Sequence, residues 1–257
     1  MAFLSLPKRL VGVNTKMYFD YPATMSYISA VSKIAPPANS STGIFIIPSY
    51  PCLETASKLL KATPQVLLGA QNCHAEDAGA HTGEVSPLML KQTGCSMVIL
   101  GHAERRSTPF NETDAVVAAK AKAVVRNGMI PLVCIGEKDK SNIISEGVGI
   151  AIRECSSQIM VVLQAIPEDA PIIFAYEPVW AIGAQEPASA DHVLAVAKNL
   201  KDLVRNEGKR EVRILYGGSA KPGTWATLKA GLDGLFLGRF AHNVDNFEKV
   251  IQEVQEA

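Results

Sequence analysis

Several polar residues that could transfer protons stand at or just after short apolar runs of the sequence. They are Asn14, Lys16, His102, Glu104 and Glu177. A carboxylate at the end of an apolar strand, as Glu177 is after IIFAY, becomes a stronger base when water is excluded. A histidine near a helix N-terminus keeps a neutral ring that can donate a hydrogen bond, and a lysine can neutralise a phosphate or polarise a carbonyl group. Residues of these types are therefore suited to removing a proton from a carbon next to a carbonyl group.

Each of these residues also has a structural interpretation when it is taken alone. Glu177 could cap a loop, His102 could lie in the core, and Lys16 could be a solvated surface charge. Glu104 could pair with Arg105 and only brace its loop.

Two glycine-containing turns are candidates for binding a phosphate. They read YGGS (216–219) and LGR (237–239), and each follows or ends an apolar run. Glycine lets backbone N–H groups approach an anion closely. Both could instead be simple tight turns, but two such turns after the last two strands of a barrel would lie where barrels commonly bind phosphate.

Short apolar runs rich in β-branched residues must position these groups. They are apolar almost throughout, as in strands that are buried on both faces. We expect eight strands: Leu10–Asn14, Gly43–Pro48, Val66–Ala70, Met97–Leu100, Ile130–Ile135, Ile172–Tyr176, Val212–Tyr216 and Gly234–Leu237.

Amphipathic stretches with a period of about 3.6 residues lie between the strands and predict helices. They are Ala23–Ile34, Leu53–Lys61, Asp114–Asn127, Gly147–Ala165, Asp191–Arg205, Pro222–Ala230 and Asn246–Gln255. Gly128 and Gly208 follow two of them and are expected to end these helices in the left-handed conformation.

This alternation predicts a closed (β/α)₈ barrel of the α/β class, with residues 1–257 forming one domain. An open doubly wound sheet is the rival, but the turn after its first strand normally carries a glycine cluster. Here that turn reads VNTKMYF. In a barrel the ends of all strands share one face, so the polar residues above would converge.

The composition excludes several other classes of protein. The 257 residues are 47% hydrophobic and carry 25 basic and 25 acidic side chains, so we expect neither a nucleic-acid-binding surface nor a membrane patch. Five cysteines without a CxxC motif argue against a disulfide framework or structural zinc. No signal peptide or membrane span is evident, so we expect a cytoplasmic protein.

Seven short segments together resemble the triosephosphate isomerase family. GHAERR (101–106), CIGE (134–137), AYEPVWAIG (175–183) and YGGS (216–219) resemble its signature segments, in the same order and at similar spacing. NTK (14–16), AQN (70–72) and TGE (82–84) extend the resemblance over the whole chain. The resemblance implies a TIM barrel, an aldose–ketose isomerase of sugar-phosphate metabolism, and neither a metal nor an organic cofactor.

The resemblance also implies a role for particular residues. Glu177 corresponds to the catalytic base, His102 to the neutral electrophile, Lys16 to the lysine that offsets substrate charge, Asn14 to its polar neighbour, and Glu104 to a supporting carboxylate. Phosphate-holding positions are Gly183, Ser219, Gly238 and the backbone of Arg239. The mobile lid would span Val179–Ala188, including Trp180, Ala184, Gln185, Glu186 and Pro187. Thr82 would reach the neighbouring subunit's site in a homodimer.

Four departures from the usual family pattern leave the substrate open. They are Thr15, Ala103, the lid sequence GAQEPA (183–188) and Arg239. The first expectation is interconversion of dihydroxyacetone phosphate and D-glyceraldehyde 3-phosphate, as in glycolysis and gluconeogenesis. PASAD (187–191) and DGLFLGRFAHN (233–243) are similar to a branch that isomerises L-erythrulose 1-phosphate to D-erythrulose 4-phosphate. A non-catalytic barrel that binds sugar phosphates is the third alternative.

Overall fold

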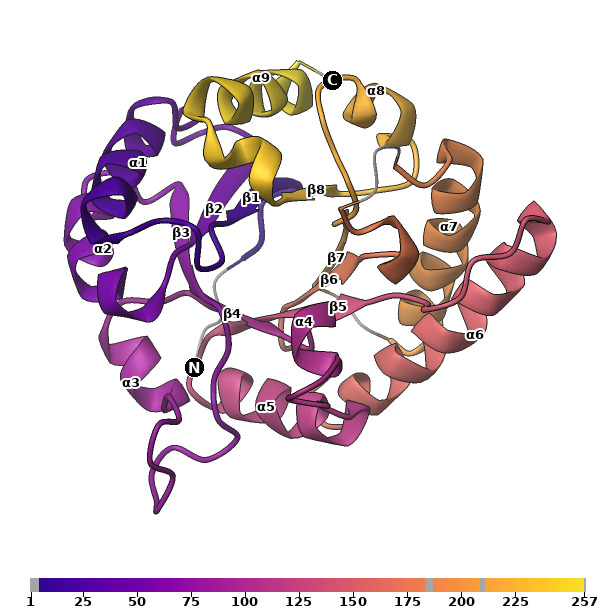
Figure 1. Cartoon of the computed structure of the whole chain (residues 1–257), viewed down its shortest axis with the longest axis horizontal. Coiled ribbons are helices and arrows are strands. Elements are labelled where there is room, and N and C mark those ends of the chain that lie inside the picture. Colours follow the sequence, from indigo (N-terminus) through magenta and orange to yellow (C-terminus); the bar gives the residue numbers. More distant parts are fainter. Residues whose placement is uncertain (1–4, 184–186, 209–210, 257) are drawn as a thin grey trace.

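The computed structural model describes residues 5–183, 187–208 and 211–256. Within these residues, eight parallel strands close into a barrel in sequence order (Figure 1). The closed ring of strands confirms the predicted (β/α)₈ barrel and excludes the open doubly wound sheet. The strands are β1 (Arg9–Asn14), β2 (Thr42–Ile47), β3 (Val66–Ala70), β4 (Met97–Leu100), β5 (Ile130–Ile135), β6 (Ile172–Tyr176), β7 (Val212–Tyr216) and β8 (Gly234–Leu237).

The strands are apolar throughout because both of their faces are buried. Side chains such as Phe45, Met97 and Phe236 fill the interior of the barrel, while their neighbours face the surrounding helices. A β-carbon at Gly12 would lie 1.9 Å from the ring of Phe45, so only glycine leaves room for this ring. Successive side chains of a strand therefore alternate between the barrel interior and the layer beneath the helices, and both environments are apolar.

Helices surround the barrel and connect its strands (Figure 1). They are α1 (Tyr21–Lys33), α2 (Leu53–Leu60), α3 (Pro87–Gln92), α4 (Ala103–Arg106), α5 (Asp114–Arg126), α6 (Ile144–Leu163), α7 (Ala190–Asn206), α8 (Thr224–Leu228) and α9 (Val244–Gln255), with 3₁₀ turns η1 (Tyr50–Cys52), η2 (Val179–Ala181) and η3 (Arg239–His242).

The seven predicted helices are all present, with ends shifted by at most three residues. Side-chain caps explain some of these ends: Asp20 accepts from the Ala23 amide at the start of α1, and Ser189 caps α7. Gly128 and Gly208 have φ of 66° and 73°, which confirms the predicted left-handed ends. Helices α3 and α4 were missed because runs of six and four residues are too short to show a helical period.

The long connection between β3 and α3, residues 71–86, extends away from the barrel (Figure 1). Thr82 lies in it and is exposed. Among the residues that the structure describes, no helix has the length and apolar character needed to cross a membrane.

Candidate active site

A cavity of about 480 Å³ opens at the carboxyl ends of the strands. Segments that follow β1, β4, β6, β7 and β8 line it, which confirms that the predicted polar residues converge on one face. Its walls include Asn14, Lys16, His102, Glu104, Glu177, Gly183, Ser219, Gly238 and Arg239.

Glu177 follows β6 and is 4% exposed. Its amide donates to the carbonyl of Ile135 at 2.8 Å, which holds it beside the end of β5. Burial raises the pKa of its carboxyl group, and the nearby charges of His102 and Lys16 oppose part of that rise. The Oε2 atom is buried and has no hydrogen-bond partner among the described residues, so it is free to accept a proton from a bound molecule.

Glycines on two neighbouring strand ends make room for Glu177. A β-carbon at Gly217 would lie 2.5 Å from Glu177 Cγ and 2.7 Å from Oε1. A β-carbon at Gly136 would lie only 1.9 Å from the Glu177 carbonyl oxygen. The glycines of CIGE and YGGS are therefore required here by close packing against the carboxylate segment.

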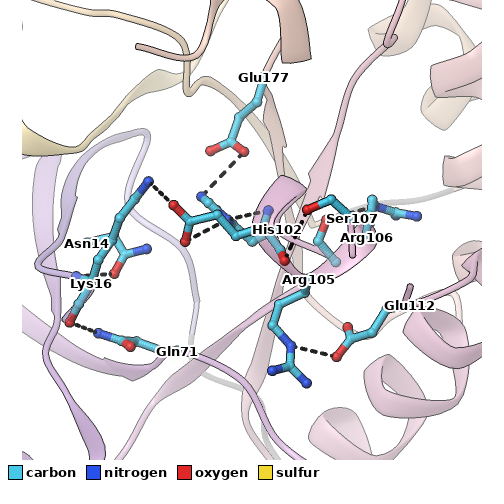
Figure 2. A network of polar contacts seen from close by, with 11 residues as sticks. Asn14, Lys16, Gln71, His102, Arg105, Arg106, Ser107, Glu112 and Glu177 are labelled. Carbon is cyan, nitrogen blue, oxygen red and sulfur yellow. Dashed lines mark hydrogen bonds and ion pairs between the residues drawn. The ribbon is translucent and has the colours of Figure 1, made fainter. Parts of the chain in front are cut away.

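His102 is the N-cap of α4, and its ring faces Glu177 (Figure 2). On its other side, its Nδ1 atom lies 3.7 Å from Glu104 Oε2. The Glu104 amide donates to its Nδ1 atom at 3.2 Å. An accepting Nδ1 has no proton in the neutral ring, so the proton is on Nε2. That atom lies 3.9 Å from Glu177 Oε2. A donor and a base thus face the same space, at a separation that leaves them free to act on a third group.

Lys16 also lines the cavity, and its ammonium group pairs with Glu104 at 2.7 Å. Its φ of 49° is in the left-handed region, which is unusual for a residue with a side chain. Asn14 Oδ1 accepts from the Lys16 amide, while Gln71 and Ser49 donate to the Lys16 carbonyl. These three contacts hold the lysine backbone in its strained conformation.

Glu104 itself is the least enclosed of these residues, with 63% of its side chain exposed. Partial burial acts to raise the pKa of its carboxyl group, but the hydrogen bond from Lys16 and the charges of His102 and Lys16 bring that pKa below its usual range. Its ion pair with Lys16 offsets the charge of the lysine.

The other end of the cavity carries cationic and glycine residues. Gly183, with φ of 73°, lies beside the guanidinium of Arg239, since a β-carbon there would be 3.7 Å from Nη2. Ser219 Oγ donates to the carbonyl of Ala181 at 3.1 Å, which ties the segment after β7 to that after β6. This end is suited to an anion.

The predicted lid is described only at its two ends, because Ala184, Gln185 and Glu186 lie outside the described residues. At the first end, the Trp180 indole donates to Glu137 at 2.9 Å, and Val179 starts the 3₁₀ turn η2. At the second end, next to Pro187, the Ala188 amide donates to the Tyr216 hydroxyl at 3.1 Å. Both ends are thus attached to neighbouring strand segments.

Sequence reasoning missed several cavity residues. These are Tyr18, Lys221 and Phe240, together with the support that His192 and Tyr176 give to Glu137. Their position a few residues after a strand was the available signal. The aromatic side chains of Tyr18 and Phe240 carry no chemical signature of their own, and Lys221 resembles any surface lysine.

Two departures from the family pattern are visible near the catalytic candidates. Thr15 is buried and its hydroxyl donates to the carbonyl of Ile47 at 3.4 Å. Ala103 opens α4 without a hydroxyl that could reach Glu177. Thr82 is not among the residues that line this cavity. Among the described residues, no cluster of three or more His, Cys, Asp or Glu side chains is arranged to hold a metal ion.

Comparison with known proteins agrees with the geometry. Residues 9–254 match the family model described as triosephosphate isomerase. The chain is 40% identical to a protein of Pectobacterium atrosepticum named L-erythrulose-1-phosphate isomerase, over 97% of both chains. It is 41% identical to a Rhizobium etli protein of the same name, over 96% of this chain and 92% of the relative.

A more distant relative carries the family's own name. The chain is 36% identical to the triosephosphate isomerase of Aquifex aeolicus, over 95% of this chain and 98% of that protein. The barrel, the shared cavity of Lys16, His102 and Glu177, and the match over nearly the whole length all lead to one conclusion: this chain is an isomerase that belongs to the triosephosphate isomerase family.

Proposed function

We propose that the protein isomerises L-erythrulose 1-phosphate to D-erythrulose 4-phosphate by proton transfer through an enediolate. The observation that carries the proposal of catalysis is the convergence of Lys16, His102 and Glu177 on one cavity. The four-carbon substrate is supported by the names of the relatives at 40–41% identity. The departures at Ala103 and Arg239 are also in keeping with a substrate other than a triose phosphate.

The two candidate substrates share the same reacting unit. L-erythrulose 1-phosphate is dihydroxyacetone phosphate with one additional hydroxymethyl group on the carbon that loses its proton. One set of catalytic groups can therefore act on both, and the choice between them depends on space and polarity next to that carbon.

In the proposed reaction, Glu177 takes the proton from the hydroxyl-bearing C3 atom, and the electrons of the C–H bond move toward the C2 carbonyl. The resulting enediolate oxygen is stabilised by His102 Nε2–H and by the Lys16 ammonium group. Glu177 then returns its proton to C2. Meanwhile His102 gives its Nε2 proton to the C2 oxygen and takes the proton of the C3 hydroxyl, so that the C3 oxygen becomes the new carbonyl and the ring is neutral again. Burial makes the ionised Glu177 a stronger base, which favours the first step.

The remaining polar residues would bind and orient the substrate. Asn14 holds the Lys16 amide, and Glu104 fixes the His102 tautomer through its backbone. Amides near Gly183, Ser219 and Gly238 would hold the phosphate, with the cationic side chain of Arg239 beside them and that of Lys221 also on the cavity wall.

A lid formed by Val179–Ala188 would cover the phosphate and exclude water from the enediolate. Support for this proposal comes from its two described ends, which hydrogen-bond to Glu137 and Tyr216 through Trp180 and Ala188. These anchors would fix where the proposed lid begins and ends.

We further propose a homodimer in which the 71–86 connection contacts a second subunit near its active site. The exposed position of Thr82 on a connection that extends from the barrel supports this. Gln71, at the base of the same connection, donates to the carbonyl of Lys16 at 2.7 Å, so a partner bound to it would also brace the lysine. Light scattering during size-exclusion chromatography tests the assembly: a single-chain mass at micromolar concentration would contradict it.

The test of function is a parallel assay of L-erythrulose 1-phosphate and D-glyceraldehyde 3-phosphate, with Glu177→Gln as the control. We expect faster turnover of the four-carbon substrate and a loss of at least about a thousandfold in Glu177→Gln, because the amide cannot accept the proton. Binding of inorganic phosphate should survive the substitution.

Each other outcome selects an alternative. Faster turnover of the three-carbon substrate would make the protein a triosephosphate isomerase and overturn the four-carbon assignment. Equal, undetectable rates for wild type and Glu177→Gln, with inorganic phosphate still bound, would favour a non-catalytic sugar-phosphate-binding protein.

A further inference from the structure

His242 connects the segment after β8 to the segment that carries Lys16. Backbone groups of even-numbered residues in β1 face β8, since the Leu10 amide donates to the Asp233 carbonyl. The carbonyl of Asn14 faces the same side, but β8 ends at Leu237 and offers it no strand partner. His242 Nε2 lies 3.1 Å from the Asn14 oxygen. A side chain thus completes the pairing of β1 beyond the end of β8.

Aromatic packing fixes the ring of His242 in place. Its centroid lies 5.0 Å from that of Phe19 in an edge-on arrangement and 5.4 Å from that of Tyr18. The Tyr27 hydroxyl donates to the carbonyl of Ala241, the neighbouring residue. Together these contacts pack the 3₁₀ turn η3 against the beginning of the β1–α1 connection.

The hydrogen bond assigns the proton of the neutral ring. A carbonyl oxygen only accepts, so Nε2 must be the protonated nitrogen of His242. Burial lowers the pKa of the ring, the bond to Asn14 opposes this, and the charges of Lys16 and Arg239 lower the pKa further. The ring thus serves as a neutral donor between two cationic residues of the cavity.

The Asn14 carbonyl is two residues before a strained conformation. Lys16 has φ of 49°, and its own carbonyl is held by Gln71 and Ser49. A strained residue keeps its conformation only when its surroundings hold it on both sides. His242 supplies the hold on the N-terminal side, opposite the contacts on the Lys16 carbonyl.

We propose that His242 is a positioning residue: by donating to the Asn14 carbonyl, it sets the placement of the Lys16 ammonium group and couples the Arg239-bearing turn to it. This inference rests on the proposed function of Lys16 as an electrophile. The turn η3 would then serve the site in two ways: it carries Arg239 at the phosphate-binding end of the cavity, and through His242 it positions Lys16.

Two substitutions separate donation from packing. His242→Phe keeps a ring between Tyr18 and Phe19 but removes the donor, whereas His242→Gln keeps an amide donor of similar reach. We expect kcat to fall about tenfold in His242→Phe, since small misplacements of catalytic groups are costly, and to stay within about threefold of wild type in His242→Gln. Tyr21→Phe, which removes only the exposed bond between the Tyr21 and Thr55 hydroxyls outside the cavity, is the matched control and should leave kcat unchanged.

A double-mutant cycle tests whether His242 acts through Lys16. In a Lys16→Met background, adding His242→Phe should cause no further loss of kcat, because the group that it positions is gone. Losses that multiply in the double variant would overturn the proposal. So would full activity of His242→Phe, or equal losses in His242→Phe and His242→Gln, which would indicate packing alone.

A spectroscopic measurement keeps this test separate from the identity of the reaction. In ¹H–¹⁵N correlation spectra, the Lys16 amide resonance should move in His242→Phe and remain near its wild-type position in His242→Gln. If wild type turns over neither sugar phosphate but this pattern is seen, the proposed function fails and the positioning role stands. An unmoved Lys16 resonance in His242→Phe would refute the positioning role in an active enzyme.

Discussion

Gly217→Ala should separate catalysis from stability in this protein. The added β-carbon would lie 2.5 Å from Glu177 Cγ, 2.7 Å from Oε1 and 3.0 Å from Cδ. Gly217 does not have a left-handed φ, so alanine fits its backbone conformation. The substitution therefore acts on the neighbouring carboxylate and on little else.

The size of the effect follows from the displacement that the contact requires. Carbon atoms in contact are about 3.5–4.0 Å apart, so Glu177 Cγ must move by about 1 Å. A displacement of about 1 Å costs roughly a hundredfold in rate, which corresponds to about 2.7 kcal/mol of transition-state stabilisation. The displaced atoms belong to a side chain next to the cavity, so we expect the free energy of unfolding to fall by less than about 1 kcal/mol.

The assay compares kcat on the preferred sugar phosphate with the midpoint of urea unfolding. Gly149→Ala is the matched control, because its β-carbon would meet only Arg153 Nη1 at an ordinary 3.6 Å. We expect both variants to unfold near wild type and only Gly217→Ala to lose turnover. A kcat within threefold of wild type in Gly217→Ala would refute the argument that Gly217 makes room for the base.

Two further predictions concern the surroundings of the same carboxylate. Gly136→Ala should prevent folding or lower the free energy of unfolding by more than about 3 kcal/mol, because its β-carbon would lie 1.9 Å from the backbone carbonyl oxygen of Glu177. A midpoint of urea unfolding like that of wild type would contradict this. The kcat/KM of wild type should fall as pH drops through the raised pKa of Glu177, above the usual 4.5 of a glutamate. Burial is the main cause of that rise, and a hydrogen bond from the Cys134 thiol lowers the same pKa. Cys134→Ala should therefore move the acidic limb of the pH profile to higher pH. An acidic limb that stays in place or moves to lower pH would show that the thiol has no such influence.

The fold and the main catalytic candidates could be predicted from the sequence because their signals are local or repetitive. Strands buried on both faces must be apolar throughout, and their alternation with amphipathic helices has few closed solutions. All eight strands begin and end within one residue of the prediction. The short segments around Lys16, His102 and Glu177 were sufficient to place these residues at strand ends and, through family resemblance, to suggest their roles.

Other features depend on contacts between residues far apart in the chain, so only the tertiary structure could decide them. The room that Gly217 leaves for Glu177 and the bond from His242 to Asn14 join segments with no periodic relation. The raised pKa of Glu177 comes from its burial, which exists only in the folded barrel. The residue types were sufficient to propose the chemistry, whereas barrel closure determined which groups are close enough to perform it, because distance and desolvation arise only when the strand ends meet.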